Sequence, residues 1–127
     1  MLIEIADNTR EYAYAPYSGY RVGAALLADS DYVYSGCNVE NASFGLAICA
    51  ERAAVAKAIS EGETDFRAVV IVTDDGASPC GACRQVLAEF GLDIAVYMAR
   101  PDGTYTAKTV RELLPDSFKL SRKRHSQ

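Results

Sequence analysis

The sequence predicts an α/β fold: a three-layer α-β-α sandwich around a mixed five-stranded sheet. Three observations lead to this prediction. Helical patterns alternate with apolar strand patterns along the chain, two strand segments are continuous apolar runs typical of strands buried on both faces, and half of the 127 residues are hydrophobic. This length suits one compact domain, so we expect a single domain over residues 1–127.

The N-terminal part is expected to form a helix, a hairpin and a loop. Residues 2–13 place apolar side chains on one face of a helix, and residues 21–28 and 32–37 have the patterns of two paired strands. The small residues Gly23–Ala25 allow a helix or a ligand to pack closely on the first strand. Residues 38–45 are polar and lie between a strand and a helix, which is a common position for a binding loop.

The rest of the chain is expected to begin with an alanine-rich helix over residues 47–61. Val55 and Ile59 mark its apolar side, and its thin alanine surface suggests that it is central and buried. The remaining expected elements are a buried strand over 67–73, a helix over 81–90 that Gly91 ends, strands over 94–99 and 105–108, and a short helix over 109–114.

Charge and hydropathy exclude some partners. The net charge is −4, and the one basic run, Arg122–His125, falls in residues 120–127, which we expect to be a flexible solvated tail. Nucleic-acid binding requires clustered Lys and Arg, so we expect no nucleic-acid partner. No stretch has the length of a membrane span and the N-terminus lacks the features of a signal peptide. We therefore expect a cytoplasmic protein with no membrane partner.

The four cysteines include one close pair, Cys80 and Cys83, at the expected start of a helix. This spacing places both sulfurs on one side of the first turn, where the helix dipole favours thiolates. A lone pair of this kind can be a redox pair or half of a structural zinc site. The only histidine is His125 in the tail, so further ligands must come from Cys37 or Cys49.

Cys49 precedes a carboxylate, Glu51, by two residues, which constrains the helix that follows. Positions i and i+2 of a continuous helix point about 200° apart. Cys49 and Glu51 can face one metal ion only if Cys49 opens the helix, so we expect the helix to begin at Cys49 or one residue before. Three protein ligands would leave zinc one open position, which is typical of catalytic sites. A closed structural site with Cys37 as fourth ligand remains an alternative.

Three thiolates place much negative charge on zinc and oppose the acidification of a bound water. Compensation is expected from the two helix N-termini and from Arg52 or Arg84, each of which follows a ligand segment. Arg52 is the stronger candidate because it lies in the helix expected to be buried. For Arg84, charge compensation and simple solvent exposure are equally consistent with the sequence.

Cys49-Ala50-Glu51 and Pro79-Cys80-Gly81-Ala82-Cys83 together match the zinc deaminase pattern. Nearly the whole chain resembles the small homotetrameric cytidine deaminases. Besides the two zinc segments, the resemblance is carried by Ala15–Ser18, Val22–Leu26, Gly36–Ala42, Arg52, Arg84–Gln85 and Glu112–Pro115. It implies hydrolytic deamination of cytidine and 2′-deoxycytidine to uridine and 2′-deoxyuridine in pyrimidine salvage.

The resemblance also implies roles for individual residues. Cys49, Cys80 and Cys83 would bind one Zn²⁺ per subunit, and Glu51 would shuttle the proton. Asn38 and Glu40 would hold the ribose 3′-hydroxyl, the Tyr20 ring would pack on the pyrimidine, and Ala50 with Glu51 would contact the base edge. Cys37 is not a ligand in the family and is expected to be a small buried apolar residue.

Three further positions match family residues that reach a neighbouring subunit of the homotetramer. Ala42 and Phe44 would contribute to the neighbour's pocket, with Phe44 replacing a Tyr that is common there, and Phe118 would close a neighbour's site. Cys49 in place of His goes with free nucleosides in the family. A deaminase of nucleoside analogues and a non-catalytic zinc module are the alternatives.

Overall fold

The computed structural model describes residues 1–121, so the basic run predicted at 122–125 lies outside the described residues. The elements follow the predicted order, with one added 3₁₀ turn. They are α1 (Leu2–Arg10), β1 (Gly23–Ala28), β2 (Val33–Cys37), η1 (Phe44–Leu46), α2 (Ala50–Ser60), β3 (Phe66–Val72), α3 (Gly81–Phe90), β4 (Ala95–Ala99), β5 (Tyr105–Thr109) and α4 (Val110–Leu113).

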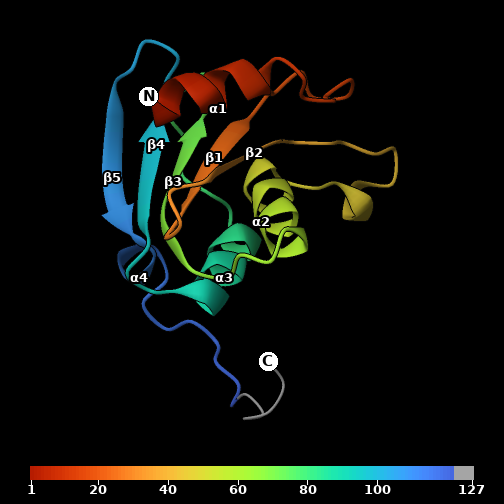
Figure 1. Cartoon of the computed structure of the whole chain (residues 1–127). Helices are drawn as coiled ribbons and strands as arrows, with labels where there is room; N and C mark the ends of the chain where they lie inside the picture. The colour runs from red at the N-terminus through yellow and green to blue at the C-terminus, as the bar shows by residue number, and fades with distance from the viewer. Residues whose placement is uncertain (122–127) are drawn as a thin grey trace.

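The five strands form one mixed sheet in the order β2-β1-β3-β4-β5 (Figure 1). β3 and β4 are parallel and are joined through α3, whereas the other neighbours are antiparallel. Gly23, the first residue of β1, pairs with Cys37 at the end of β2 and with Val72 at the end of β3. The chain therefore enters β1 and leaves β2 and β3 at one edge of the sheet.

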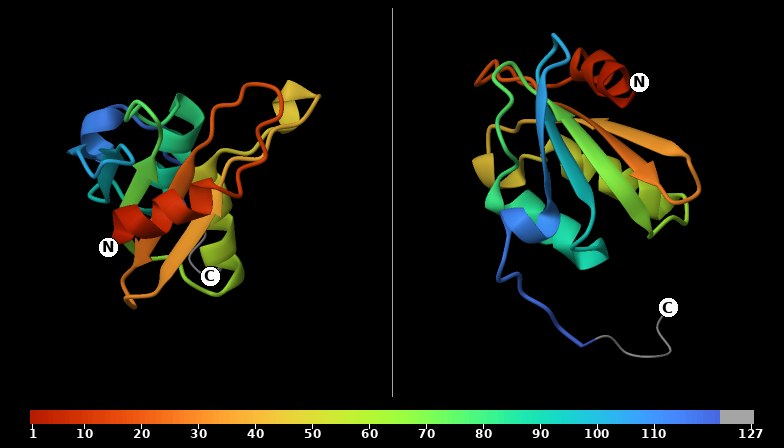
Figure 2. Two further views of the ribbon diagram at one scale, coloured as in Figure 1. Left: turned by 90° about the horizontal axis from the view of Figure 1, so that it is seen from above. Right: turned by 90° about the vertical axis from the view of Figure 1, so that its left-hand side faces the viewer.

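Helices cover both faces of the sheet, which confirms the three-layer prediction (Figure 2). α1 packs on one face through Ala6, against Ala25, Val70 and neighbouring strand residues. α2, α3 and α4 cover the other face, where Ala54, Leu87 and Val110 join the larger core cluster. β3 contributes to both clusters and is buried at every position but one, as its apolar run predicts.

Two glycines let helices approach the sheet more closely than any side chain would permit. A Cβ on Gly23 would lie 2.0 Å from the carbonyl oxygen of Ala6 in α1. A Cβ on Gly36 would lie 2.6 Å from the backbone nitrogen of Ala54 in α2, on the opposite face. Gly23, one of the small residues predicted to admit a helix or a ligand, thus admits α1, and Gly36, which was not singled out from the sequence, admits α2.

Two sequence expectations are wrong in detail. α1 ends at Arg10 rather than at residue 13, because the N–H groups of Tyr12 and Ala13 turn back to carbonyls three residues earlier. α2 is buried on one side only, and Ile59, predicted on its apolar side, is 38% exposed.

Within residues 1–121, no helix combines the length and apolar character that crossing a bilayer requires.

Gly23→Ala is expected to destabilise the fold by about 3 kcal/mol, because the new methyl group meets α1 backbone that cannot move without repacking the layer. Lys57→Ala is the control, since Lys57 is exposed on α2, and it should change stability by less than about 0.5 kcal/mol. Urea unfolding at equal protein concentration measures both. Equal midpoints for the two variants would contradict this account of α1 packing.

Candidate metal centre and active site

Two helix N-termini meet at the edge of the sheet where β2 and β3 end. Cys49 is the N-cap of α2 and Cys80 is the N-cap of α3, and both have extended backbone angles. Neither sulfur caps its own helix, so both are available to another partner. Cys49 opens α2 as its N-cap, as its shared role with Glu51 requires, although the helix begins at Ala50, one residue later than predicted. The broader expectation of a helix from residue 47 starts too early.

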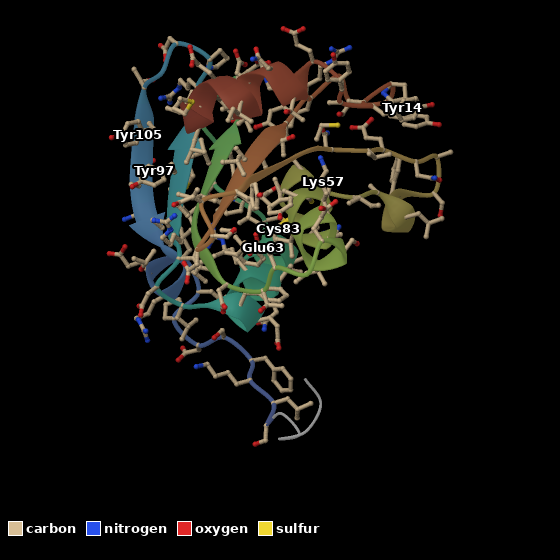
Figure 3. All side chains as sticks on the ribbon, in the orientation of Figure 1. Tyr14, Lys57, Glu63, Cys83, Tyr97 and Tyr105 are labelled. Atoms are coloured by element: carbon tan, nitrogen blue, oxygen red, sulfur yellow. The ribbon has the colours of Figure 1, made fainter. Side chains whose placement is uncertain are left out.

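Three sulfurs converge between these helix ends. The Sγ atoms of Cys49 and Cys80 are 3.9 Å apart, and those of Cys80 and Cys83 are 3.5 Å apart. Tetrahedral zinc with Zn–S bonds of about 2.3 Å requires sulfur separations of about 3.8 Å. The three donors, all within 4.8 Å of one another, therefore fit a zinc ion. Cys83, in the first turn of α3, is fully buried, and its place is labelled in Figure 3.

Cys37 is half-buried rather than buried, and it is not in the three-sulfur group that the described residues form. This geometry gives no support to a closed site with Cys37 as fourth ligand. Cys49, Cys80 and Cys83 would hold a zinc ion with three protein ligands, which would leave one position for water or substrate.

The thiols are poised to bind a cation. Hydrogen bonding from Cys83 and from Arg52 lowers the pKa of Cys49 to about 5, against the opposing effect of burial. The hydrogen bond with Cys49 raises the pKa of Cys83, and burial raises it further. Cys49 is therefore the thiol of the group that loses its proton most readily, which suits a metal ligand.

Arg52 lies against this thiolate. Its Nη2 atom is 4.0 Å from the Cys49 sulfur and donates to the carbonyl of Ala47 at 3.2 Å. Arg84 binds backbone and hydroxyl groups instead. Its guanidinium donates to the carbonyls of Pro79 and Leu113, at 2.8 and 2.7 Å, and to the Ser78 hydroxyl. Arg84 thus ties the loop before Cys80 to α4, a role that the sequence did not reveal.

Glu51 lies one residue inside α2 and is 5% exposed. Burial raises the pKa of its carboxyl above the ordinary value, and the charge of Cys49 raises it further. Glu51, Cys49 and Cys80 all line one cavity of about 290 Å³. A carboxyl group with a raised pKa beside a metal site is suited to move protons near neutral pH.

Four other predicted site residues, Tyr20, Asn38, Glu40 and Ala50, also line this cavity. The Asn38 amide accepts from the Val22 N–H and donates to the Tyr20 carbonyl, both at 2.9 Å. The Glu40 carboxylate accepts from the N–H groups of Tyr17 and Ser18 and from the Ser18 hydroxyl. These bonds lower the pKa of Glu40, so it is ionised at neutral pH. Both side chains fix the segment that enters β1.

Three predicted residues lie away from this cavity. Phe44 is 82% exposed on the loop that carries η1, and Ala42 is exposed on the same loop. Phe118 is 70% exposed, and its backbone exchanges two hydrogen bonds with the amide of Gln85 on α3. One chain therefore does not bring these residues to its own site, and their assignment to a neighbour's site stays a prediction.

Asp75 and Thr73 are site residues that sequence reasoning missed. Thr73 is buried and lines the cavity, and the Asp75 carboxylate accepts a 2.8 Å hydrogen bond from the Tyr20 hydroxyl. The available signal was a pair of aspartates directly after a buried strand, at the edge where loops gather.

Arg52→Gln is expected to weaken metal binding by about 10- to 100-fold, because the variant loses the positive charge beside the Cys49 thiolate. Competition with a chromophoric chelator measures the affinity for zinc. Lys57→Gln removes a charge from the exposed side of the same helix and should leave the affinity unchanged. Equal affinities in the Arg52 variant and the wild type would exclude charge compensation by Arg52.

Comparisons with known proteins agree with this geometry. The cytidine deaminase of Halalkalibacterium halodurans is 50% identical over 121 residues, 93% of this chain and 92% of that protein. The cytidine deaminase of Sporosarcina psychrophila is 47% identical over 92% of this chain and 88% of that protein. The crystal structure of cytidine deaminase from Burkholderia pseudomallei superposes with a TM-score of 0.88 at 45% identity, covering 92% of this chain and 96% of that one.

Residues 1–99 match the family described as "Cytidine and deoxycytidylate deaminase zinc-binding region". That match includes all three cysteines of the sulfur group and Glu51. The resemblance drawn from the sequence is thereby confirmed, and the chain belongs to the cytidine and deoxycytidylate deaminase family.

Proposed function

We propose that this protein hydrolyses cytidine and 2′-deoxycytidine to uridine and 2′-deoxyuridine with release of ammonia. The observation that carries the proposal is the buried carboxyl of Glu51 in one small cavity with a three-thiol zinc site. The curated relatives named above are cytidine deaminases, and this chain spans nearly all of their length.

Cys49, Cys80 and Cys83 would hold the zinc, and Arg52 would offset part of their charge. Bound zinc supplies Lewis acidity that lowers the pKa of a coordinated water towards neutrality. Glu51 would accept one proton from the attacking water and deliver it to the ring nitrogen beside the reacting carbon, to which the water oxygen becomes bonded. The same carboxylate would then take the second proton from that oxygen and pass it to the amine, so that the C–N bond breaks, ammonia leaves and a carbonyl remains. Its burial supports this role, because a raised pKa eases both uptake and release of the proton.

Asn38 and Glu40 would bind the ribose. The amide of Asn38 keeps one N–H after donating to Tyr20, and the Glu40 carboxylate keeps free lone pairs, so a hydroxyl can accept from one and donate to the other. The ring of Tyr20 would pack on the pyrimidine, while the Ala50 backbone and Glu51 contact the base edge. Each of these residues lines the cavity.

Charge favours nucleosides over nucleotides. Among the residues that the structure describes, no Lys, Arg or His lines the cavity, whereas the acidic residues Glu40 and Glu51 do. A 5′-phosphate would bring negative charge beside them without a basic partner, which is unfavourable in a partly closed site. Nucleoside analogues remain a second substrate class.

We also propose a homotetramer with shared sites. The loop between β2 and α2 projects from the body of the chain (Figure 1) and carries Phe44 and Leu46, which are 82% and 66% exposed. Packing against a second copy would bury this apolar surface and place Ala42 and Phe44 of one chain at the pocket of its neighbour. Phe118, on the C-terminal segment, would close a neighbour's site.

We further propose a cytoplasmic location and a role in pyrimidine salvage. The four free cysteines support the location, because free thiols persist in a reducing compartment.

Glu51→Gln is expected to lower kcat for cytidine by at least about 10³-fold, because the amide cannot carry the proton. Its zinc content and thermal midpoint should match those of the wild type. Loss of absorbance at the cytosine band measures turnover, and the wild type should act on cytidine and 2′-deoxycytidine but not on deoxycytidylate.

The wild-type assay tests the proposal as a whole. No turnover by zinc-loaded wild type would refute the proposed function. A fully active Glu51→Gln variant would refute the proton-shuttle role alone.

A further inference from the structure

Tyr20 and Asp75 join two loops that both contribute residues to the wall of the cavity. Tyr20 lies on the segment that enters β1, and Asp75 lies on the loop from β3 to α3. The Tyr20 hydroxyl donates to Oδ1 of Asp75 at 2.8 Å, across 55 residues of sequence. Tyr20 lines the cavity, and so do Thr73 and Ala77, on either side of Asp75.

Asp75 is held in place by its own loop. The same Oδ1 atom accepts from the Thr73 hydroxyl at 3.2 Å and from the Ala77 N–H at 3.3 Å. The buried Thr73 hydroxyl also accepts from the Ala77 N–H at 3.0 Å. The hydrogen bond from Tyr20 lowers the pKa of Asp75, so the acceptor is a carboxylate at neutral pH and the bond is charge-assisted.

Tyr20 is equally fixed at its backbone. Its N–H donates to the Ser18 hydroxyl oxygen at 3.0 Å, and its carbonyl accepts from the Asn38 amide at 2.9 Å. Tyr20 is therefore held at two points. Its backbone is bound to Asn38, which follows β2, and its hydroxyl is bound to Asp75, which lies in the loop after β3. A ring tethered at both ends cannot swing away from the cavity without breaking a bond.

We propose that the Tyr20–Asp75 hydrogen bond is a latch that positions the Tyr20 ring and the 73–79 loop to bind the nucleoside. Asp75 acts through Tyr20 and is a positioning residue. This inference rests on the proposed function, because it assigns the ring to the substrate pocket. It separates two contributions of Tyr20: the ring, which contacts substrate, and the hydroxyl, which holds the ring.

The latch acts on binding and leaves the chemical step alone. Glu51 and the cysteines are fixed by the N-terminal turns of α2 and α3, which do not depend on the Tyr20 hydroxyl. Without the latch, the segment that enters β1 and the 73–79 loop must become ordered each time a ligand binds. The entropy lost in this ordering weakens affinity. Substrate and product then lose affinity by the same factor, so KM rises while kcat stays the same.

Tyr20→Phe and Asp75→Ala test the latch, because the first keeps the ring and removes only the hydroxyl. Each variant is expected to raise KM for cytidine and the inhibition constant of uridine by about 5- to 30-fold, with kcat changed less than about 2-fold. The double variant should be no worse than the more impaired single variant. Tyr12→Phe makes the same chemical change at a side chain that is 81% exposed and should leave every constant unchanged.

Three outcomes would overturn the latch. They are effects that multiply in the double variant, a fall in kcat with KM unchanged, and a lower thermal midpoint with unchanged KM. If zinc-loaded wild type does not turn over cytidine, the proposed function fails separately. Calorimetric Kd values for cytidine and uridine then decide, and either an unchanged Kd in Tyr20→Phe or no binding by wild type overturns the latch.

Discussion

The site depends on bringing the sulfurs of Cys49 and Cys80, 31 residues apart in the sequence, to within 3.9 Å of each other. Thiolates at this separation repel one another, so the fold must supply positive charge and fixed backbone. The pairing of β1 with both β2 and β3 fixes the backbone, because its register brings the ends of β2 and β3 to one edge of the sheet. The N-termini of α2 and α3 then direct their dipoles at the sulfurs, with Arg52 alongside.

The walls of the cavity are held by polar side chains that bind backbone. Asn38 and Glu40 fix the segment entering β1, and Arg84 fixes the loop before Cys80. Positions set in this way are defined before substrate arrives, which reduces the entropy lost on binding. The Tyr20–Asp75 bond extends the arrangement to a second loop, because it ties the segment entering β1 to the loop from β3 to α3.

Sequence reasoning succeeded where local chemistry decides the structure. The C-terminal end of α3 at Phe90 was predicted because Gly91 ends the helix. Cys49 was placed at the N-terminus of α2 because Cys49 and Glu51 cannot face one ion from mid-helix. It failed where long-range geometry decides. The exposed side of α2, the role of Arg84 and the Tyr20–Asp75 bond depend on neighbours that no spacing within a segment reveals.

The central claim is that three thiols and Glu51 form one zinc-dependent deaminase site per chain. Titrating metal-free protein with zinc while measuring ammonia released from cytidine tests this most directly. The account predicts activity that rises linearly and saturates at one zinc per chain. Full activity in metal-free protein, or stoichiometric zinc binding without any ammonia release, would contradict it.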